Sequence, residues 1–159
     1  MGPIGFEQHD HSTCIADGVA RVAEYCKREG LQLTPVRKRV LEILLHQHRS
    51  MGAYEILDIL RAEGLGSQPP VAYRALDFLV KNGFAHKIER LNAFTACTHP
   101  GENHTPAFLI CRKCNSVAEA FSEPDKGRLA RTAHDLGFRI ERVVVEAEGI
   151  CPNCAEAPA

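Results

Sequence analysis

Four of the seven cysteines form two C-x2-C pairs, Cys111 with Cys114 and Cys151 with Cys154. Structural zinc sites take four tetrahedral donors, and one tight turn can deliver both thiolates of such a pair to a single ion. The segment between the pairs, residues 115–150, is longer than the gap of a short zinc ribbon and can hold a helix and strands. We therefore predict a structural zinc site that ties together the two ends of a small domain.

A disulfide pair or a redox dithiol is the alternative interpretation of these cysteines. The stretch from Cys151 to Cys154 resembles a redox C-x-x-C, but no βαβ pattern surrounds it. The start of the chain lacks the basic and apolar segments of a signal peptide, and no apolar run is long enough to span a membrane. An odd number of cysteines without an export signal favours reduced thiols, metal ligands and a cytoplasmic location.

The chain preceding the cysteine pairs has the pattern of helices followed by a hairpin. Residues 1–15 have the composition of a flexible tail, and residues 16–98 predict a winged helix-turn-helix domain with its hinge. Thr34 and Pro35 are typical of a helix start, and Gly83 of a helix end. The predicted helices span residues 16–29, 35–46, 53–62 and 71–82, and the predicted hairpin strands span residues 84–89 and 93–98.

Residues 99–159 predict a small α/β domain, so the whole chain is assigned an α+β fold. Strands are expected at 107–111 and 117–121, a helix at 122–136 and a longer strand at 138–148. A domain of this size cannot bury a large core, so bound zinc would contribute to its stability. Because exposed sheet edges tend to pair with another copy, we also predict a homodimer.

The net charge of −1 gives no sign of nucleic-acid binding, so any such function must depend on local geometry. In a winged helix the 71–82 helix would enter the major groove, with Arg74 on its exposed N-terminal portion. Arginine in that place can bind guanine O6 and N7 together. The alternative is a plain helical bundle in which Arg74 is only solvated.

A second, mixed set of possible metal ligands surrounds the predicted hinge. Imidazole, thiolate and carboxylate together suit zinc, whereas Fe(II) and Mn(II) prefer fewer sulfurs and more oxygens. An ion held there would fix the angle between the two domains. The candidates are His86, Cys97, His104 and Glu119, although His99 and Glu102 are as eligible by spacing alone.

Several motifs together resemble the ferric uptake regulator family of bacterial metal-sensing repressors, over about residues 16–155. They are Leu33-Thr34-Pro35 with Arg37, residues 53–57, 69–76 and 83–87, and both cysteine pairs. The stretch 73–79 and the single histidine, His104, before the first pair are most similar to the zinc-sensing branch. The iron and peroxide branches usually carry a richer histidine cluster at that place.

The resemblance implies roles for particular residues. It assigns His86, Cys97, His104 and Glu119 to a regulatory zinc site, in addition to the structural zinc of the cysteine pairs. It also implies that Tyr54 and Arg74 contact bases, that Tyr73 contacts the DNA backbone, and that Asp58 and Arg61 bridge neighbouring dimers on one operator. The alternatives are an i,i+3 surface pair for Asp58 and Arg61 and a half-buried aromatic cap for Tyr54.

The function expected from the resemblance is zinc-dependent repression of zinc-uptake genes, by a homodimer with two zinc ions per chain and no enzymatic activity. One alternative is a sibling sensor of iron, manganese or peroxide. The other is a thiol oxidoreductase that uses Cys151 and Cys154. A group at the start of the chain, His9, Asp10, His11 and Cys14, could form an accessory metal site, although a solvated tail is the more ordinary interpretation.

Overall fold

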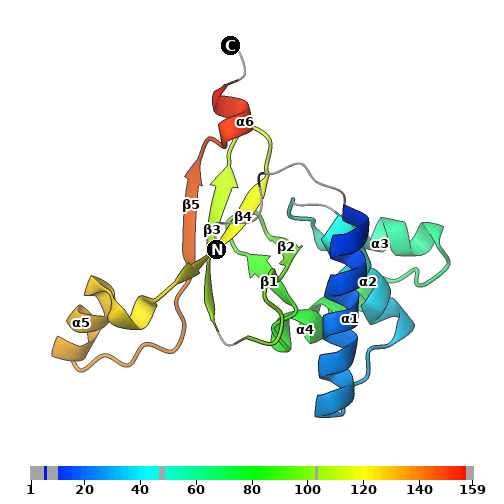
Figure 1. The fold of residues 1–159 in the computed structure, drawn as a ribbon, viewed down its shortest axis with the longest axis horizontal. Coiled ribbons are helices and arrows are strands. Elements are labelled where there is room, and N and C mark those ends of the chain that lie inside the picture. The colour runs from blue at the N-terminus through cyan, green and yellow to red at the C-terminus, as the bar shows by residue number, and fades with distance from the viewer. Residues whose placement is uncertain (1–5, 7–10, 47–48, 103, 157–159) are drawn as a thin grey trace.

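The computed structural model describes residues 6, 11–46, 49–102 and 104–156, which form a helical part and a sheet part (Figure 1). No helix among these residues is both long and apolar enough to cross a membrane. The helical part contains α1 (His11–Glu29), α2 (Pro35–His46), α3 (Ala53–Ala62) and α4 (Pro69–Lys81). An antiparallel hairpin of β1 (Ala85–Ile88) and β2 (Ala93–Ala96) follows. This order is that of a winged helix, as predicted.

The helix boundaries follow local chemistry that is visible in the sequence. The backbone N–H of Arg37 donates to Thr34 Oγ1 at 3.3 Å, so Thr34 caps α2 and Pro35 occupies its first turn. The backbone N–H of Gly52 donates to the Glu55 carboxylate at 3.0 Å at the start of α3. After α4, Gly83 adopts a φ of +75°, which lets the chain reverse into β1.

One helix is longer than predicted. α1 begins at His11 rather than at residue 16, so the prediction of a tail is wrong for residues 11–15. The half-buried Ile15 explains this, because it continues the apolar stripe of Val19, Val22 and Cys26 by one turn. Gly18 lies in close contact with α2, since a Cβ there would come within 2.8 Å of Leu45 Cδ1. His9 and Asp10 lie outside the described residues.

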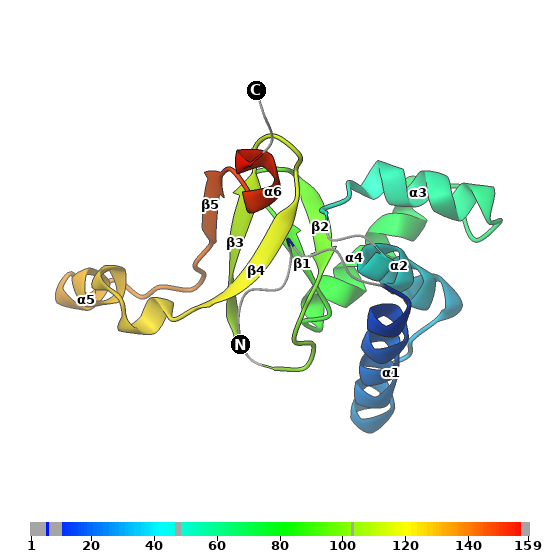
Figure 2. The ribbon, with the colours of Figure 1, turned by 45° about the horizontal axis from the view of Figure 1, so that its top comes forward.

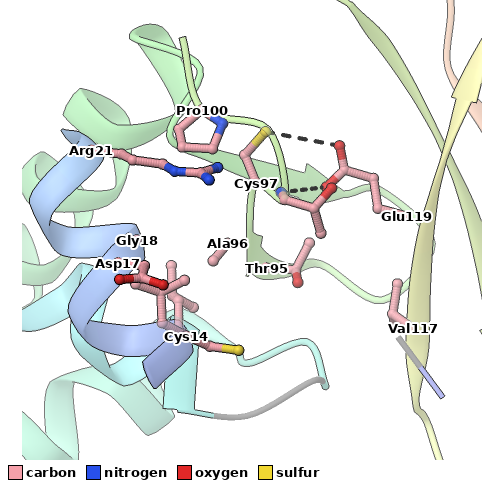
Figure 3. A pocket seen from close by; sticks show the side chains of 13 residues that line it. Cys14, Asp17, Gly18, Arg21, Thr95, Ala96, Cys97, Pro100, Val117 and Glu119 are labelled. Atoms are coloured by element: carbon pink, nitrogen blue, oxygen red, sulfur yellow. Dashed lines mark hydrogen bonds between the residues drawn. The ribbon is translucent and has the colours of Figure 1, made fainter. Parts of the chain in front are cut away.

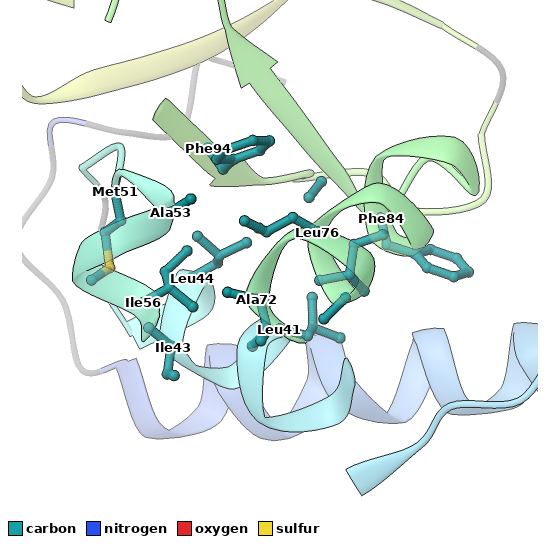
Figure 4. Close-up of a cluster of buried hydrophobic side chains, with 14 of the residues drawn as sticks. Leu41, Ile43, Leu44, Met51, Ala53, Ile56, Ala72, Leu76, Phe84 and Phe94 are labelled. Atoms are coloured by element: carbon teal, nitrogen blue, oxygen red, sulfur yellow. The ribbon is translucent and has the colours of Figure 1, made fainter. Parts of the chain in front are cut away.

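The four helices and the hairpin share one apolar core (Figure 4). Its buried side chains come from the four helices and the hairpin, and the inner face of α4 packs against them. They include Val22, Cys26, Val40, Leu41, Leu44, Ile56, Leu57, Leu60, Leu76, Leu79 and Phe84. Met51 joins this core and exchanges backbone hydrogen bonds with Phe94 of β2 at 2.8 Å each.

The sheet part consists of three strands in the order β4-β3-β5. The central strand β3 (Thr105–Cys111) is antiparallel to β4 (Val117–Ser122) and parallel to β5 (Val145–Gly149). A 3-10 turn (Pro124–Lys126) and α5 (Arg128–Asp135) form an arm between β4 and β5, and a short α6 (Pro152–Ala155) ends the described chain. Figures 1 and 2 show that this arm projects away from the sheet.

Two boundaries in the sheet part differ from the prediction. The helix expected over residues 122–136 is interrupted at Gly127, whose extended backbone separates the 3-10 turn from α5. The strand expected over residues 138–148 is present only as β5. The pairing of β3 with β5 begins at Ala107 and Val145, and no strand among the described residues pairs with residues 138–144.

The hairpin is also the element that joins the two parts. Ile88 at the end of β1 packs into a second apolar cluster with Phe108, Ile110 and Val117 of the sheet, and Leu91 of the hairpin turn covers this cluster. Figures 1 and 2 both place the hairpin between the helices and the sheet. Side chains of the hairpin therefore face the sheet.

Truncation of Leu76 tests the shared core. Leu76 is fully buried on α4, so Leu76→Ala is expected to lower the free energy of unfolding by about 2–5 kcal/mol through lost burial and a residual cavity. Lys81→Ala, at the exposed end of the same helix, should change it by less than about 0.5 kcal/mol. Chemical denaturation of both variants measures the difference, and equal stabilities would contradict the assigned core.

Candidate metal centres and DNA-facing side chains

The two cysteine pairs meet at one end of the sheet. Cys111 ends β3, Cys114 lies in the turn toward β4, and Cys151 and Cys154 flank the first turn of α6. The four sulfur atoms lie within 4.8 Å of one another. Cys114 Sγ and Cys151 Sγ are 3.7 Å apart. Two thiolates bound to one tetrahedral zinc at 2.3 Å are about 3.8 Å apart, so the cluster has the dimensions of a zinc site.

Backbone groups support thiolates in this cluster. The N–H of Cys151 donates to Cys111 Sγ at 3.4 Å. This bond, together with the N–H of Cys114, lowers the pKa of the Cys111 thiol to about 6. Asn115, with a φ of +59°, closes the turn between the first pair and β4. Cys151 and Cys154 belong to the same four-sulfur group rather than to an isolated dithiol, so this geometry favours metal binding over a redox pair.

The second cluster brings together the four predicted ligands from separate elements. His86 lies on β1, Cys97 follows β2, His104 precedes β3, and Glu119 lies on β4. One ligand atom from each lies within 4.8 Å of all the others. Glu119 Oε1 is 2.9 Å from His104 Nε2 and 3.3 Å from His86 Nε2, and Cys97 Sγ is 3.6 Å from His104 Nε2. Donors around a tetrahedral zinc are roughly 3.3–3.8 Å apart, so the separations within this cluster are close to those of a zinc site.

Neighbouring groups orient these ligands. His104 Nδ1 is 2.9 Å from the carbonyl oxygen of Glu102, which can only accept, so Nδ1 carries a proton and Nε2 is the ring nitrogen that faces the other candidate ligands. The backbone N–H of Thr98 donates to Glu119 Oε2 at 3.0 Å and leaves Oε1 facing the other ligands. Within the described part of the chain, the buried Nε2 of His86 makes no hydrogen bond. A buried nitrogen without a partner is costly, and a bound cation would satisfy it.

Burial and charge set the protonation of this cluster. Burial raises the pKa of the Glu119 carboxyl, but the facing imidazoles of His86 and His104 and the N–H of Thr98 outweigh it and bring the pKa to about 2. Burial, and then the Glu119 carboxylate, raise the pKa of the Cys97 thiol to about 12. Before metal binds, the site therefore holds an ionised carboxylate and a protonated thiol.

The structure separates the alternative ligands from this group. The ring of His99 packs against Phe121 with ring centroids 4.7 Å apart, and its Nδ1 lies 2.9 Å from Thr98 Oγ1. Glu102 contributes its backbone carbonyl to the orientation of His104, not its carboxylate to the cluster. Spacing in the sequence could not make this choice, because it depends on which side chains turn toward the Glu119 carboxylate.

A cavity of about 220 Å³ lies beside the second cluster, between α1 and β2 (Figure 3). Cys97 and Glu119 line it on one side, and Asp17 and Arg21 of α1 line it on the other. Cys14 also borders this cavity. The sequence did not indicate any involvement of α1 near the metal ligands, because the contact arises only from the packing of α1 across the hairpin.

The side chains predicted to face DNA lie exposed on α3 and α4. Tyr54 is 63% exposed, so it is not a half-buried cap, and Tyr73 is 42% exposed. Both border one surface groove between α3, α4 and the hairpin. Arg74 is exposed beside Tyr73. Asp58 and Arg61 form an i,i+3 ion pair at 3.4 Å, and Arg61 also donates to the Ser67 carbonyl at 2.9 Å.

Comparison with known proteins identifies the family of this chain. Residues 28–148 match the model of the ferric uptake regulator family. The chain is 36% identical to the zinc uptake regulation protein of Escherichia coli over 148 residues, which cover 92% of this chain and 86% of that protein.

Solved structures of zinc uptake regulators are also similar to this chain. A zinc uptake regulator complexed with zinc and DNA superposes with a TM-score of 0.84 at 35% identity, covering 89% of this chain and 95% of the other. The holo form of a protein named XcZur gives 0.80 at 41% identity, covering 89% and 99%. Its apo form gives 0.50 at the same identity, covering 89% and 97%. The predicted resemblance is thus confirmed, and the chain belongs to the ferric uptake regulator family.

Proposed function

We propose that this chain is a zinc-responsive transcriptional repressor that binds operator DNA of zinc-uptake genes as a zinc-loaded homodimer in the bacterial cytoplasm. The observation that carries the proposal is the cluster of His86, Cys97, His104 and Glu119, whose members come from both parts of the molecule. The family consists of transcription regulators, which supports a DNA-binding role rather than an enzymatic one. The similarity to zinc uptake regulators supports the choice of metal.

The proposed mechanism couples metal binding to the angle between the two parts. His86 and Cys97 move with the hairpin, whereas Glu119 belongs to the sheet and His104 to the loop before it. A bound zinc ion would supply a divalent charge that these four ligands share. The ligands would then hold the hairpin against β4, and with it the winged helix at one angle to the sheet. The close superposition on the holo form of XcZur, and the weaker one on its apo form, support this coupling.

The cysteine cluster has a different part in the proposal. A zinc ion bound by Cys111 and Cys114 together with Cys151 and Cys154 would keep β3 and α6 together whether or not the second site is filled. Two zinc ions per chain are therefore proposed, one structural and one regulatory.

Homodimer formation is supported by apolar surface that a single chain leaves uncovered. Leu129, Leu136 and Phe138 of the arm are 61%, 77% and 67% exposed, and β5 has an open edge because it is the last strand of its sheet. A second copy of the chain would cover both features.

The winged helices of such a dimer would contact DNA through Arg74 and Tyr54, which face bases, and Tyr73, which faces the backbone. Asp58 and Arg61 are proposed to bridge neighbouring dimers.

Two other functions compete with this proposal. The first is a sensor of iron, manganese or peroxide. In an anaerobic metal titration of DNA binding, the proposed zinc sensor should respond at a far lower free concentration of Zn(II) than of Fe(II) or Mn(II), and the alternative sensor should not. The Cys97 thiol at the site disfavours that alternative. A thiol oxidoreductase would turn over a disulfide substrate through Cys151 and Cys154. If those cysteines hold zinc instead, they become reactive toward thiol reagents only after chelation.

Replacement of Cys97 tests the regulatory site. Cys97→Ser is expected to yield a folded dimer that retains one zinc per chain and loses zinc-dependent operator binding, because a hydroxyl is a far poorer zinc ligand than a thiolate. Cys14→Ser, a cysteine outside both clusters, is the control and should retain two zinc ions. Metal analysis and operator binding at buffered free zinc measure both effects. Full operator binding by Cys97→Ser would refute the regulatory assignment.

The pKa of Cys97 predicts the pH dependence of zinc binding at this site. Because that pKa is raised to about 12, the thiol is protonated below this pH and must release its proton when it binds zinc. Affinity is therefore expected to rise with pH, by about tenfold per unit for the one proton that the thiol releases. Competition with a chelator measures the slope, and an affinity independent of pH would contradict the prediction.

Replacement of Arg74 tests the recognition helix. Arg74→Ala is expected to weaken operator binding by about 1–3 kcal/mol and to relax the preference for one base pair, since a bidentate contact to guanine would be lost. Arg112→Ala, an exposed arginine at the cysteine cluster, should leave base preference intact. Binding to operator variants at constant salt provides the measurement, and an unchanged preference in Arg74→Ala would exclude it from base recognition.

A further inference from the structure

The turn of the hairpin contacts the sheet part through a set of charged residues. This set includes none of the candidate metal ligands. The Glu146 carboxylate on β5 accepts hydrogen bonds from the backbone N–H groups of Glu89 and Arg90, at 2.7 Å and 3.1 Å. Arg90 also forms an ion pair with Glu148, and Arg142, which precedes β5, forms one with Glu89. We call these five residues the turn latch.

The strand register relates the turn latch to the proposed regulatory site. Glu119 on β4 is the register partner of Phe108 on β3, and Phe108 is the partner of Glu146 on β5. Partners in register share one face of a sheet, so the three side chains form a row across the face that meets the hairpin. Glu119 contacts His86 at one end of this row, and Glu146 contacts the turn at the other. The hairpin is thus attached to the sheet at two flanks.

In the turn latch, each charged side chain of the hairpin faces a side chain of opposite charge from the sheet part. The hairpin contributes the anion Glu89 and the cation Arg90, and the sheet part opposes them with Arg142 and Glu148. The Arg142 hydrogen bond lowers the pKa of the Glu89 carboxyl, and the Glu148 carboxylate raises the pKa of the Arg90 guanidinium. Exposed ion pairs are individually weak. The Glu146 carboxylate fixes the position of the hairpin turn relative to β5, because its two oxygens accept hydrogen bonds from two successive backbone N–H groups.

We propose that the turn latch is a metal-independent attachment that sets the free zinc concentration at which the regulatory site fills. This proposal rests on the proposed function. A ligand whose site is assembled only in a fraction of the molecules binds with an affinity reduced by that fraction. The latch holds the hairpin on β5 without an ion and keeps His86 and Cys97 near Glu119. It thereby raises the fraction of chains in which the four ligands are already together, and weakening the latch lowers the zinc affinity without altering a ligand.

Charge reversal tests the proposal with zinc alone as the ligand and no DNA present. Arg90→Glu and Glu148→Arg should each weaken zinc binding at the regulatory site by about three- to tenfold in a chelator competition, and the double variant should recover most of the loss. Glu146→Ala, which removes both backbone contacts, should weaken it at least as much. High salt should weaken zinc binding more in the unmodified protein than in Arg90→Glu, since salt screens the attraction between Arg90 and Glu148 that this variant no longer has.

A matched control is the exposed pair of Lys126 and Glu123, 2.7 Å apart and away from the hairpin. Lys126→Glu should leave zinc affinity unchanged. Unchanged affinity in Arg90→Glu, Glu148→Arg and Glu146→Ala would overturn the proposal, as would a double variant no better than its parents. The two proposals can fail separately, because zinc affinity is measured without DNA. If the latch variants change zinc affinity as expected but operator binding does not depend on zinc, the repressor function is refuted and the proposed role of the turn latch is retained.

Discussion

The buried carboxylate of Glu119 is the group on which the relation between the two parts of this molecule depends. It lies on β4 of the sheet and faces His86 of the hairpin and His104 of the connecting loop. A carboxylate that is this deeply buried must find hydrogen-bond donors or a metal, because an unpaired charge in the protein interior is costly. The residues that satisfy it belong to different elements, so its electrostatic requirement becomes a constraint on how the winged helix meets the sheet.

The second attachment, at the hairpin turn, uses a different kind of chemistry. The metal-ligand flank is buried and contains a thiol and imidazoles, whereas the turn latch is exposed and contains only carboxylates, guanidinium groups and backbone amides. Phe108 lies between them and packs against the ring of His86, with centroids 5.7 Å apart. In the proposed function, loosening one flank would let the hairpin tilt on this apolar contact, which is the kind of motion a metal-dependent switch requires.

Much of the site was accessible from residue types and spacing. The cysteine pairs predicted one zinc site directly, because two thiolates in one turn have few other uses in such a chain. The helix boundaries at Thr34 and Gly83 were predictable because caps are local interactions between residues close in sequence. By contrast, residues 138–144 were assigned to a strand from their alternation, and no neighbouring strand exists to pair with them in a single chain. Pairing is a non-local property that a pattern cannot establish.

By itself, the sequence determined most element types and the order of a winged helix before a sheet that carries two cysteine pairs. These follow from periodicity, capping and residue spacing, which act over a few residues, whereas the second set of candidate ligands came from the family resemblance. Only the tertiary structure decided that His104 rather than His99 turns toward Glu119, that α1 borders the site, and that Glu146 receives the hairpin turn. Each of these depends on strand register and on the packing of distant segments, and the physical contacts involved join residues far apart in the chain.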